Sequence, residues 1–338
     1  MDEQLIDKIR KHLDKSLLPP MIILDVTNVC NLRCIHCPHA EMQKRPDFKQ
    51  THMSWERFRK VIDQIGKSRQ PCLLRFCGDG EPLMHPRILE MIEYAKANTG
   101  AVINLTTNGQ LLNREKAKYL VDIGIDLIDV SIDALTAPVY EKIRRGGRYE
   151  TLKKNLFELL SLRKPGYTTK VMVSFIEQQE NLHETEPFRH YWEPMVDYVM
   201  VRSLHSASGM VKQKESVLHN KAKQQNRYPC PHLWKRLTVD FAGNIKFCAH
   251  DWEMDPSMIL GNVDSRTLQE VWQGIRLKSL REMHLQKKFE SDLVCADCTD
   301  WASSRWEYGY ERLVDKVVFG KPTLLSCLPV LPQEKSGK

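Results

Sequence analysis

Three closely spaced cysteines give the first indication of chemistry. Cys30, Cys34 and Cys37 follow one another in the spacing C-x3-C-x2-C. Three thiolates on one loop cannot saturate a cubane of four irons, so one iron would keep an open coordination position. An open position on a metal is where chemistry takes place, as in a catalytic zinc site. From this motif alone the alternative is a zinc site completed by His36 or His39.

A second group of cysteines lies in the last third of the chain. Cys230 and Cys248 stand alone, and Cys295 and Cys298 form a C-x2-C pair. Four thiolates suffice to close an iron–sulfur cluster without an open position. The alternative is a structural zinc ribbon, which C-x2-C pairs commonly form, although two isolated cysteines fit a ribbon badly.

Short β-branched runs alternate with longer amphipathic segments between Met21 and Ser203. This alternation is typical of βαβ units around a parallel sheet, so the fold class is α/β. Helices are expected over Pro86–Ala97 and Asn113–Ile123, with Pro86 in a first turn and Gly124 as a stop. The six expected strands are Met21–Thr27, Leu73–Cys77, Val102–Thr107, Leu127–Ile132, Lys170–Ile176 and Tyr198–Val201.

Polar and glycine residues stand where these strands end. The second strand runs into Gly78-Asp79-Gly80-Glu81-Pro82, where glycines allow close backbone approach and Glu81 can pair with an ammonium group. Asn108 follows the third strand, Ser131 ends the fourth and Arg202 follows the sixth. Barrel enzymes bind ligands at this end of their strands. Taken singly, each of these polar residues fits a turn, cap or surface role equally well.

Composition and charge place the chain among globular proteins. Its 338 residues have 42% hydrophobic and 28% charged residues and a net charge of +7, without a Lys/Arg block. No apolar run approaches a membrane span, and no signal peptide opens the chain. We therefore expect a cytoplasmic protein with no membrane or nucleic-acid partner. In that reducing compartment metal ligation is favoured over disulfides, and Cys72 and Cys77 are expected to be buried, unreactive thiols.

The sequence divides into five segments. An N-terminal amphipathic helix is expected over 1–20, the parallel sheet over 21–205, a polar linker over 206–228, a second unit over 229–304 and a tail over 305–338. The second unit should begin with a hairpin, Leu237–Phe241 and Asn244–Phe247, and continue with one amphipathic helix over Leu268–Met283.

The two cysteine groups in this order resemble the radical S-adenosylmethionine (SAM) superfamily, in particular its SPASM and Twitch subgroup. The first motif is similar to the one that binds a [4Fe-4S] cluster whose open iron chelates SAM. The resemblance implies a partial (β/α)6 barrel with a small C-terminal domain that holds an auxiliary [4Fe-4S] cluster. The expected metal ligands are Cys30, Cys34, Cys37, Cys230, Cys248, Cys295 and Cys298.

The resemblance also implies a SAM site. Gly78–Pro82 resembles the element that binds the SAM amino group, with Glu81 and the backbone as matched positions and Asp79 in place of a usual glycine. Asn108 and Ser131 would meet the SAM ribose or carboxylate, and Arg144 would pair with the carboxylate. His36 stands where the family usually has another aromatic residue. The SAM-binding residues expected are His36, Gly78, Asp79, Gly80, Glu81, Pro82, Asn108, Ser131 and Arg144.

In having a single expected auxiliary cluster, the chain resembles the radical SAM dehydrogenases of aminoglycoside biosynthesis. The function expected is therefore oxidation of an alcohol on a small sugar or aminocyclitol by a 5′-deoxyadenosyl radical, with a flavodoxin- or ferredoxin-type electron donor. Arg202 is the one candidate for a catalytic residue. The alternatives are a maturase of ribosomal peptides that forms thioethers or epimerises residues, a sugar epimerase or decarboxylase, and a zinc-binding interaction module without turnover.

Overall fold

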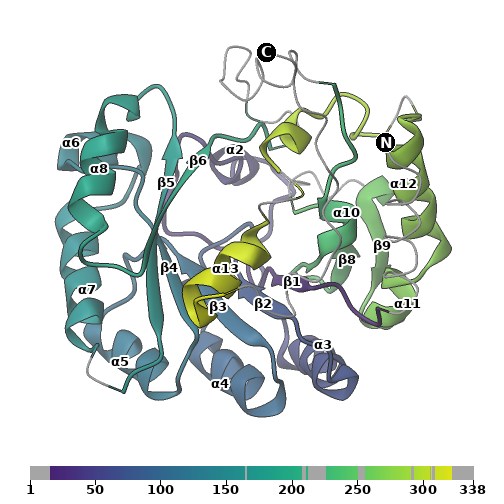
Figure 1. Cartoon of the computed structure of the whole chain (residues 1–338), viewed down its shortest axis with the longest axis horizontal. Coiled ribbons are helices and arrows are strands. Elements are labelled where there is room, and N and C mark those ends of the chain that lie inside the picture. The colour runs from purple at the N-terminus through teal and green to yellow at the C-terminus, as the bar shows by residue number, and fades with distance from the viewer. Residues whose placement is uncertain are drawn as a thin grey trace.

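Six parallel strands form the centre of the molecule. The computed structural model describes residues 16–163, 166–207, 211, 226–249, 256–290, 293–304, 306 and 309–321. Each strand pairs in parallel with the next along the chain (Figure 1). All six predicted strands are confirmed, with ends that differ by at most a few residues: β1 (Met21–Leu24), β2 (Leu73–Phe76), β3 (Val102–Thr107), β4 (Leu127–Ser131), β5 (Lys170–Glu177) and β6 (Tyr198–Ser203).

Helices follow the strands and cover one face of the sheet (Figure 1). Side chains of Ser54 and Asn113 cap two of them by accepting backbone N–H groups, and Gly124 ends the second with a φ of 70°. Pro86 lies before the helix that it was expected to begin, because that helix starts at Ile88. The helices are α2 (His39–Met42), α3 (Trp55–Ser68), α4 (Ile88–Asn98), α5 (Arg114–Asp122), α6 (Ala137–Ile143), α7 (Tyr149–Ser161) and α8 (Thr185–Trp192), with single turns η1 (Pro82–Met84) and η2 (Leu182–Glu184).

The two faces of the sheet bury different side chains, because successive residues of a strand point to opposite sides. The outer face, under the helices, is apolar and belongs to the main core. The inner face has an apolar layer that includes Met21, Leu73, Val102, Leu127 and Met172. Nearer the carboxyl ends of the strands it becomes polar and still buried, with Arg75, Asn104, Asp129 and Ser174.

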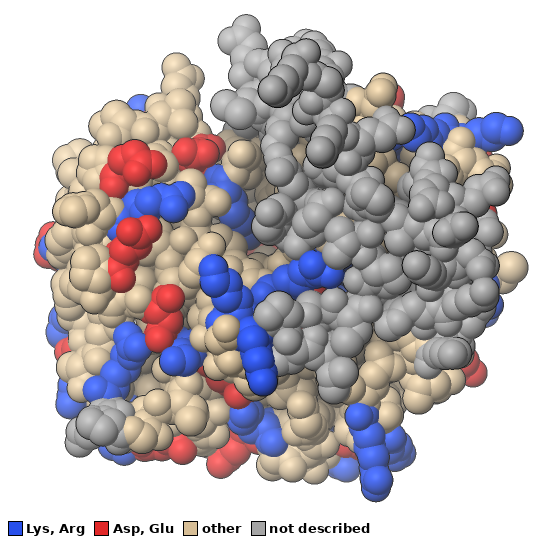
Figure 2. Space-filling view, in the orientation of Figure 1, with Lys and Arg blue, Asp and Glu red and all other residues tan. Residues whose placement is uncertain are grey.

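A C-terminal helix, α13 (Tyr310–Phe319), packs on the inner face of this sheet. Val314 is fully buried against the apolar layer, together with Leu313 and Val317. Figure 1 shows α13 in front of the sheet, on the side away from α4–α8. Lys and Arg side chains gather over this region of the face in Figure 2, and Lys316 and Lys321 are exposed there. α13 thus occupies the interior of the partial barrel.

The second group of strands continues the same sheet. β7 (Arg236–Val239) pairs in parallel with β1, and β8 (Asn244–Lys246) and β9 (Ile259–Asn262) follow in antiparallel pairing. The hairpin prediction is confirmed, and the described parts of the two expected units share one nine-stranded sheet. The domain boundaries themselves stay predictions, since residues 1–15, most of the linker and the tail beyond 321, with Cys327, lie outside the described residues.

The single helix expected over Leu268–Met283 is wrong. The chain forms α11 (Leu268–Trp272) and α12 (Ile275–Gln286), separated at Gly274. Gly274 has extended backbone, and a Cβ on it would lie 2.7 Å from the Glu270 carbonyl oxygen, so the chain turns too tightly there for a continuous helix. The remaining short elements are α10 (His232–Lys235), η3 (Pro256–Met258) and η4 (Asp300–Ser303).

Candidate functional site

The three-cysteine loop leaves β1 and lies against the end of α6. Backbone N–H groups of Arg33 and Ile35 donate to the carbonyls of Arg145 (2.8 Å) and Ile143 (2.9 Å). The loop between the first and third cysteines is therefore anchored from both strand and helix. This places Cys30, Cys34 and Cys37 at the carboxyl end of the sheet, where the sequence predicts ligand binding.

Burial disfavours the thiolate form of these three cysteines. It raises the pKa of Cys30 to about 12, with smaller contributions from neighbouring charges, and it also raises the pKa of Cys34 and Cys37. The guanidinium of Arg144, whose Nη1 is 4.0 Å from Cys34 Sγ, opposes this effect. Metal ligation deprotonates thiols, so a donor set of one buried and two partly buried thiols fits a cationic iron cluster.

The glycine-rich turn after β2 packs directly on the cysteine loop. A Cβ on Gly80 would lie 2.3 Å from the Thr27 carbonyl oxygen and 2.6 Å from that of Val29. The Glu81 N–H donates to the same Val29 oxygen at 2.9 Å. A Cβ on Gly78 would collide with the Asp25 side chain at 2.2 Å. Glycine is therefore required at both positions for the turn to reach the loop.

Glu81 is buried among donors from η1 and from the end of β3. Its carboxylate accepts from the Thr107 hydroxyl (2.6 Å), the Asn108 N–H (2.7 Å) and the Leu83 N–H (3.1 Å). Burial raises the pKa of Glu81, and these hydrogen bonds lower it. The arrangement fixes the carboxylate beside the cysteine loop, where an added ammonium group would offset the cost of its burial. Pro82 begins η1 directly after it.

Arg144 has an internal carboxylate partner that the sequence did not predict. Its Nη2 and Nε donate to Asp133 Oδ2 at 2.6 and 2.9 Å, and both side chains are buried. Asp133 adopts a left-handed backbone, with φ of 64°. His36 Nε2 lies 3.6 Å from the same oxygen. Burial lowers the pKa of His36 to about 4, so its ring is neutral at physiological pH.

The other predicted SAM residues lie around the same strand ends. Asn108 Nδ2 donates to Asn31 Oδ1, in the cysteine loop, at 2.8 Å. Ser131 ends β4 and pairs in register with Ser174 of β5. Asp79 is buried near Asp25, and burial together with that neighbouring charge raises the Asp25 pKa well above its usual value. Asp25 is a buried acid that the sequence reasoning missed.

A polar layer of the inner sheet face lies below these strand ends. The Tyr310 hydroxyl of α13 is 3.0 Å from Asn104 Oδ1 and 3.1 Å from Asp129 Oδ2. The Arg75 guanidinium stacks on the Tyr310 ring at 3.9 Å and lies 3.6 Å from Asp129. Arg202, the predicted catalytic candidate, contributes a positive charge that acts on both His36 and Tyr310, and its Nε is buried without a partner.

The sequence predicts that both Cys72 and Cys77 are buried, and only Cys72 is. Cys72 is 1% exposed in the main core. Cys77 is only partly buried and lies beside the inner apolar layer, with Arg75 near enough to lower the pKa that burial raises. Neither cysteine belongs to the two groups of predicted ligands.

The second group of cysteines surrounds one cavity. Cys230, Cys248, Cys295 and Cys298 all line it, although they come from before α10, after β8 and after α12. Burial raises the pKa of Cys230 to about 12 and also raises that of Cys295 and Cys298. Four buried or partly buried thiols around one cavity fit a fully ligated cluster.

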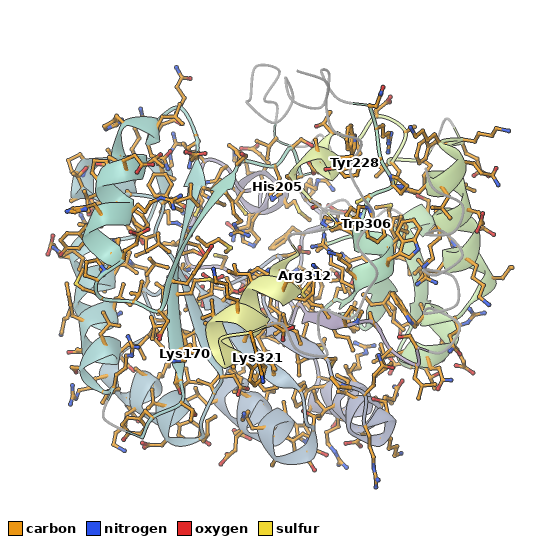
Figure 3. The ribbon with its side chains drawn as sticks, viewed as in Figure 1. Lys170, His205, Tyr228, Trp306, Arg312 and Lys321 are labelled. Atoms are coloured by element: carbon orange, nitrogen blue, oxygen red, sulfur yellow. The ribbon has the colours of Figure 1, made fainter. Side chains whose placement is uncertain are left out.

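Arginine and aromatic side chains hold this cavity together. Arg227 Nη1 donates to the Ala296 carbonyl at 2.8 Å, and its guanidinium stacks on Phe289 at 4.0 Å. Tyr228 packs edge-on against Trp301, with ring centroids 4.8 Å apart. Figure 3 shows Tyr228 and Trp306 on the side of α10 and β8, and Arg312 on α13 near the centre. Among the described residues that line this cavity, none belongs to the first cysteine loop.

The described residues offer no mononuclear metal site and no membrane-spanning helix. Within the described ranges, no three His, Cys, Asp or Glu side chains are close enough to share one metal ion, as a mononuclear zinc site would require. No helix in the same part of the chain is long and apolar enough to span a membrane.

Comparisons with known proteins agree with this geometry. Residues 24–186 match the radical SAM superfamily model, and residues 230–299 match the SPASM iron–sulfur cluster-binding domain. These domains imply a SAM-binding [4Fe-4S] cluster and an auxiliary cluster. The chain is 29% identical to the tungsten-containing aldehyde ferredoxin oxidoreductase cofactor-modifying protein of Pyrococcus furiosus over 54% of its length, and it spans about half (51%) of that relative.

Solved structures share the fold at low identity. BtrN in complex with AdoMet and 2-DOIA has a TM-score of 0.55 and 16% identity, and the match covers 79% of this chain and 87% of BtrN. Streptococcus suis SuiB bound to precursor peptide SuiA has a TM-score of 0.61 and 15% identity, and the match covers 89% of this chain and 74% of SuiB. The fold prediction is confirmed: a partial radical SAM barrel is followed by a SPASM-type region. The chain belongs to the radical SAM superfamily and carries a C-terminal SPASM domain.

Proposed function

We propose that this protein cleaves SAM reductively and uses the resulting 5′-deoxyadenosyl radical to oxidise an alcohol of a small sugar or aminocyclitol. The observation that carries the proposal is the pairing of two cysteine sites of different kinds with a buried polar layer inside the barrel. When bound, the cluster on Cys30, Cys34 and Cys37 supplies the electron that cleaves SAM, and the auxiliary cluster offers an acceptor for a second electron.

The proposed SAM site uses the strand-end residues. Glu81 and the backbone of Gly78–Pro82 would hold the amino group, since the fixed carboxylate needs a positive partner. Asn108 and Ser131 would bind the ribose or carboxylate, and His36 would lie beside the adenine. The positive charge of Arg144 would attract the SAM carboxylate. Two hydrogen bonds from its guanidinium to one oxygen of Asp133 fix its orientation.

The polar layer supports a small hydroxylated substrate. Asn104, Asp129, Ser174 and Tyr310 carry amide, carboxylate and hydroxyl groups that hydrogen-bond to one another, and groups of these kinds also bind hydroxyl groups well. Arg202 lies nearer the carboxyl ends of the strands than Asp129 and has a buried Nε without a partner, so it would bind a substrate oxygen. α13 covers the inner face at the amino ends of the strands, away from the cysteine loop. These polar groups are why we favour a small hydroxylated molecule over a peptide chain as substrate.

The reaction balances as a two-electron oxidation. A hydrogen atom leaves the carbinol carbon for the 5′-deoxyadenosyl radical, the hydroxyl group loses a proton, and the second electron leaves the substrate, which becomes a ketone. BtrN, whose structure was determined with 2-DOIA, supports an aminocyclitol substrate. SuiB, determined with its precursor peptide, supports the alternative of a peptide maturase.

Anaerobic reconstitution tests the proposal at two levels. The protein should bind about eight irons in two four-iron clusters and release 5′-deoxyadenosine from SAM when dithionite or a reduced flavodoxin is added. A Cys34→Ala variant should lose that release and keep about four irons. Wild-type protein that binds only zinc and releases no 5′-deoxyadenosine would overturn the proposal.

Substrate class is tested by isotope transfer. Candidate aminocyclitols and sugars with deuterium at the carbinol carbon are incubated with SAM and reductant. Deuterium in 5′-deoxyadenosine together with a ketone product supports alcohol oxidation. Deuterium transfer from a peptide substrate, with no transfer from any polyol, would favour the maturase alternative.

A further inference from the structure

The four-cysteine cavity contains a polar atom that has no partner. His284, on α12, lines the cavity and is only 1% exposed, and its Nε2 makes no hydrogen bond. A buried donor left without an acceptor is unfavourable and rare in folded proteins. The position of this nitrogen therefore calls for a group that the protein itself does not supply.

The surroundings of His284 fix which nitrogen carries the proton. The Cys230 backbone N–H donates to Nδ1 at 3.3 Å, so Nδ1 must present a lone pair and the hydrogen of the neutral ring lies on Nε2. The ring packs edge-on against Phe289 at 4.9 Å and against Trp234 at 6.5 Å. These contacts hold the imidazole in one orientation with its N–H group in the cavity.

Arg227 provides a second buried donor beside the same cysteines. Its Nε lacks a partner, but its other nitrogens donate to the carbonyls of Cys295 and Ala296. Substituting Arg227 would therefore disturb the C-x2-C turn itself. Among the described residues, His284 makes no such bond to the C-x2-C turn, and its one hydrogen bond to a ligand segment is the one that Nδ1 accepts from the Cys230 backbone.

We infer that His284 Nε2–H donates a hydrogen bond to a sulfur atom of the auxiliary cluster, either a cysteine thiolate or a bridging sulfide. The inference rests on the proposed ligand set of four cysteines and not on the substrate. A hydrogen bond withdraws negative charge from sulfur and stabilises the reduced cluster more than the oxidised one. His284 is thus a positioning residue that raises the reduction potential of the electron acceptor.

The experiment isolates the auxiliary cluster. In a Cys30→Ala, Cys34→Ala, Cys37→Ala background only this cluster can assemble. His284→Phe keeps a flat ring without a donor, and His284→Gln keeps an N–H group. Each protein is reconstituted anaerobically, its iron content and circular dichroism are measured, and its midpoint potential is determined by EPR-monitored titration.

We expect the His284→Phe protein to keep about four irons and to show a more negative potential, while His284→Gln stays near the parent protein. A His284→Phe protein that folds but loses its cluster would overturn the inference, because the lost Nδ1 acceptor of the Cys230 N–H would account for that loss. An unchanged potential in His284→Phe, an equal change in both variants, or cluster loss in both would overturn the inference. So would EPR evidence of direct nitrogen ligation by His284.

The background protein separates this inference from the proposed function. A parent triple variant that binds no cluster would overturn the ligand set and this inference together. Release of 5′-deoxyadenosine by the wild-type protein would still stand in that case. Failure of the isotope-transfer experiment would leave the potential measurement unaffected.

Discussion

Substitution of Gly80 tests whether the glycine-rich turn and the cysteine loop form one site. In Gly80→Ala the new Cβ would lie 2.3 Å from the Thr27 carbonyl oxygen and 2.6 Å from that of Val29. Both neighbours are backbone atoms, so no side-chain rotation relieves the contact. The turn and the loop must separate by roughly 1 Å to restore an ordinary contact, and a shift of that size in an active site costs about 100-fold in rate.

The same collision should lower stability. Forcing an extra methyl group into a packed interior costs about 1–3 kcal/mol, and each kcal/mol lowers the melting midpoint by about 2–4 °C in a domain of this order of size. We therefore expect Gly80→Ala to melt earlier and to release 5′-deoxyadenosine about 100-fold more slowly. The assays are an anaerobic thermal scan of the reconstituted protein and quantitation of 5′-deoxyadenosine.

Gly100→Ala provides the matched control. A Cβ on Gly100 meets nothing within 4 Å, and its backbone does not require glycine. Alanine there should change stability by no more than about 1 kcal/mol, in the stabilising direction, and leave SAM cleavage unchanged. If Gly80→Ala matched Gly100→Ala in both assays, the reasoning about close packing of turn and loop would be refuted.

Three further predictions concern single groups. Cys248→Ala should leave the SAM-cleaving cluster intact, so iron content should fall to about four per chain, and unchanged iron content would contradict the ligand assignment. Tyr310→Phe removes the hydroxyl beside Asn104 and Asp129 and should lower the unfolding free energy by about 1 kcal/mol in denaturant titrations, with no change if that contact is not made in solution. Because burial raises the Asp25 pKa above the usual 3.8, folded protein holds a proton that unfolded protein loses as pH rises, so stability falls from pH 4 upward. Asp25→Asn should remove that part of the pH dependence, and identical pH profiles for the two proteins would show that the shift is absent.

Local patterns determined the framework of the molecule. Strands with β-branched residues and helices with caps such as Asn113 are encoded by neighbouring residues, so their positions followed from the sequence. Cysteine spacing likewise identified the first group and the C-x2-C pair of the second, because residues on one short loop stay close in any fold. The break at Gly274 was missed because the hydrophobic pattern continues through it and only the tight turn interrupts the helix.

Tertiary structure decided which distant groups meet. An amphipathic pattern says that α13 buries one face, but not that this face covers the inside of the barrel and brings Tyr310 to Asp129. No local signal pairs Arg144 with Asp133, since both depend on how α6 returns to the end of β4. The sequence by itself therefore determined the kinds of metal site and their order. Only the packing of segments far apart in the chain gave those sites their partners, including His284 beside four cysteines from three separate segments.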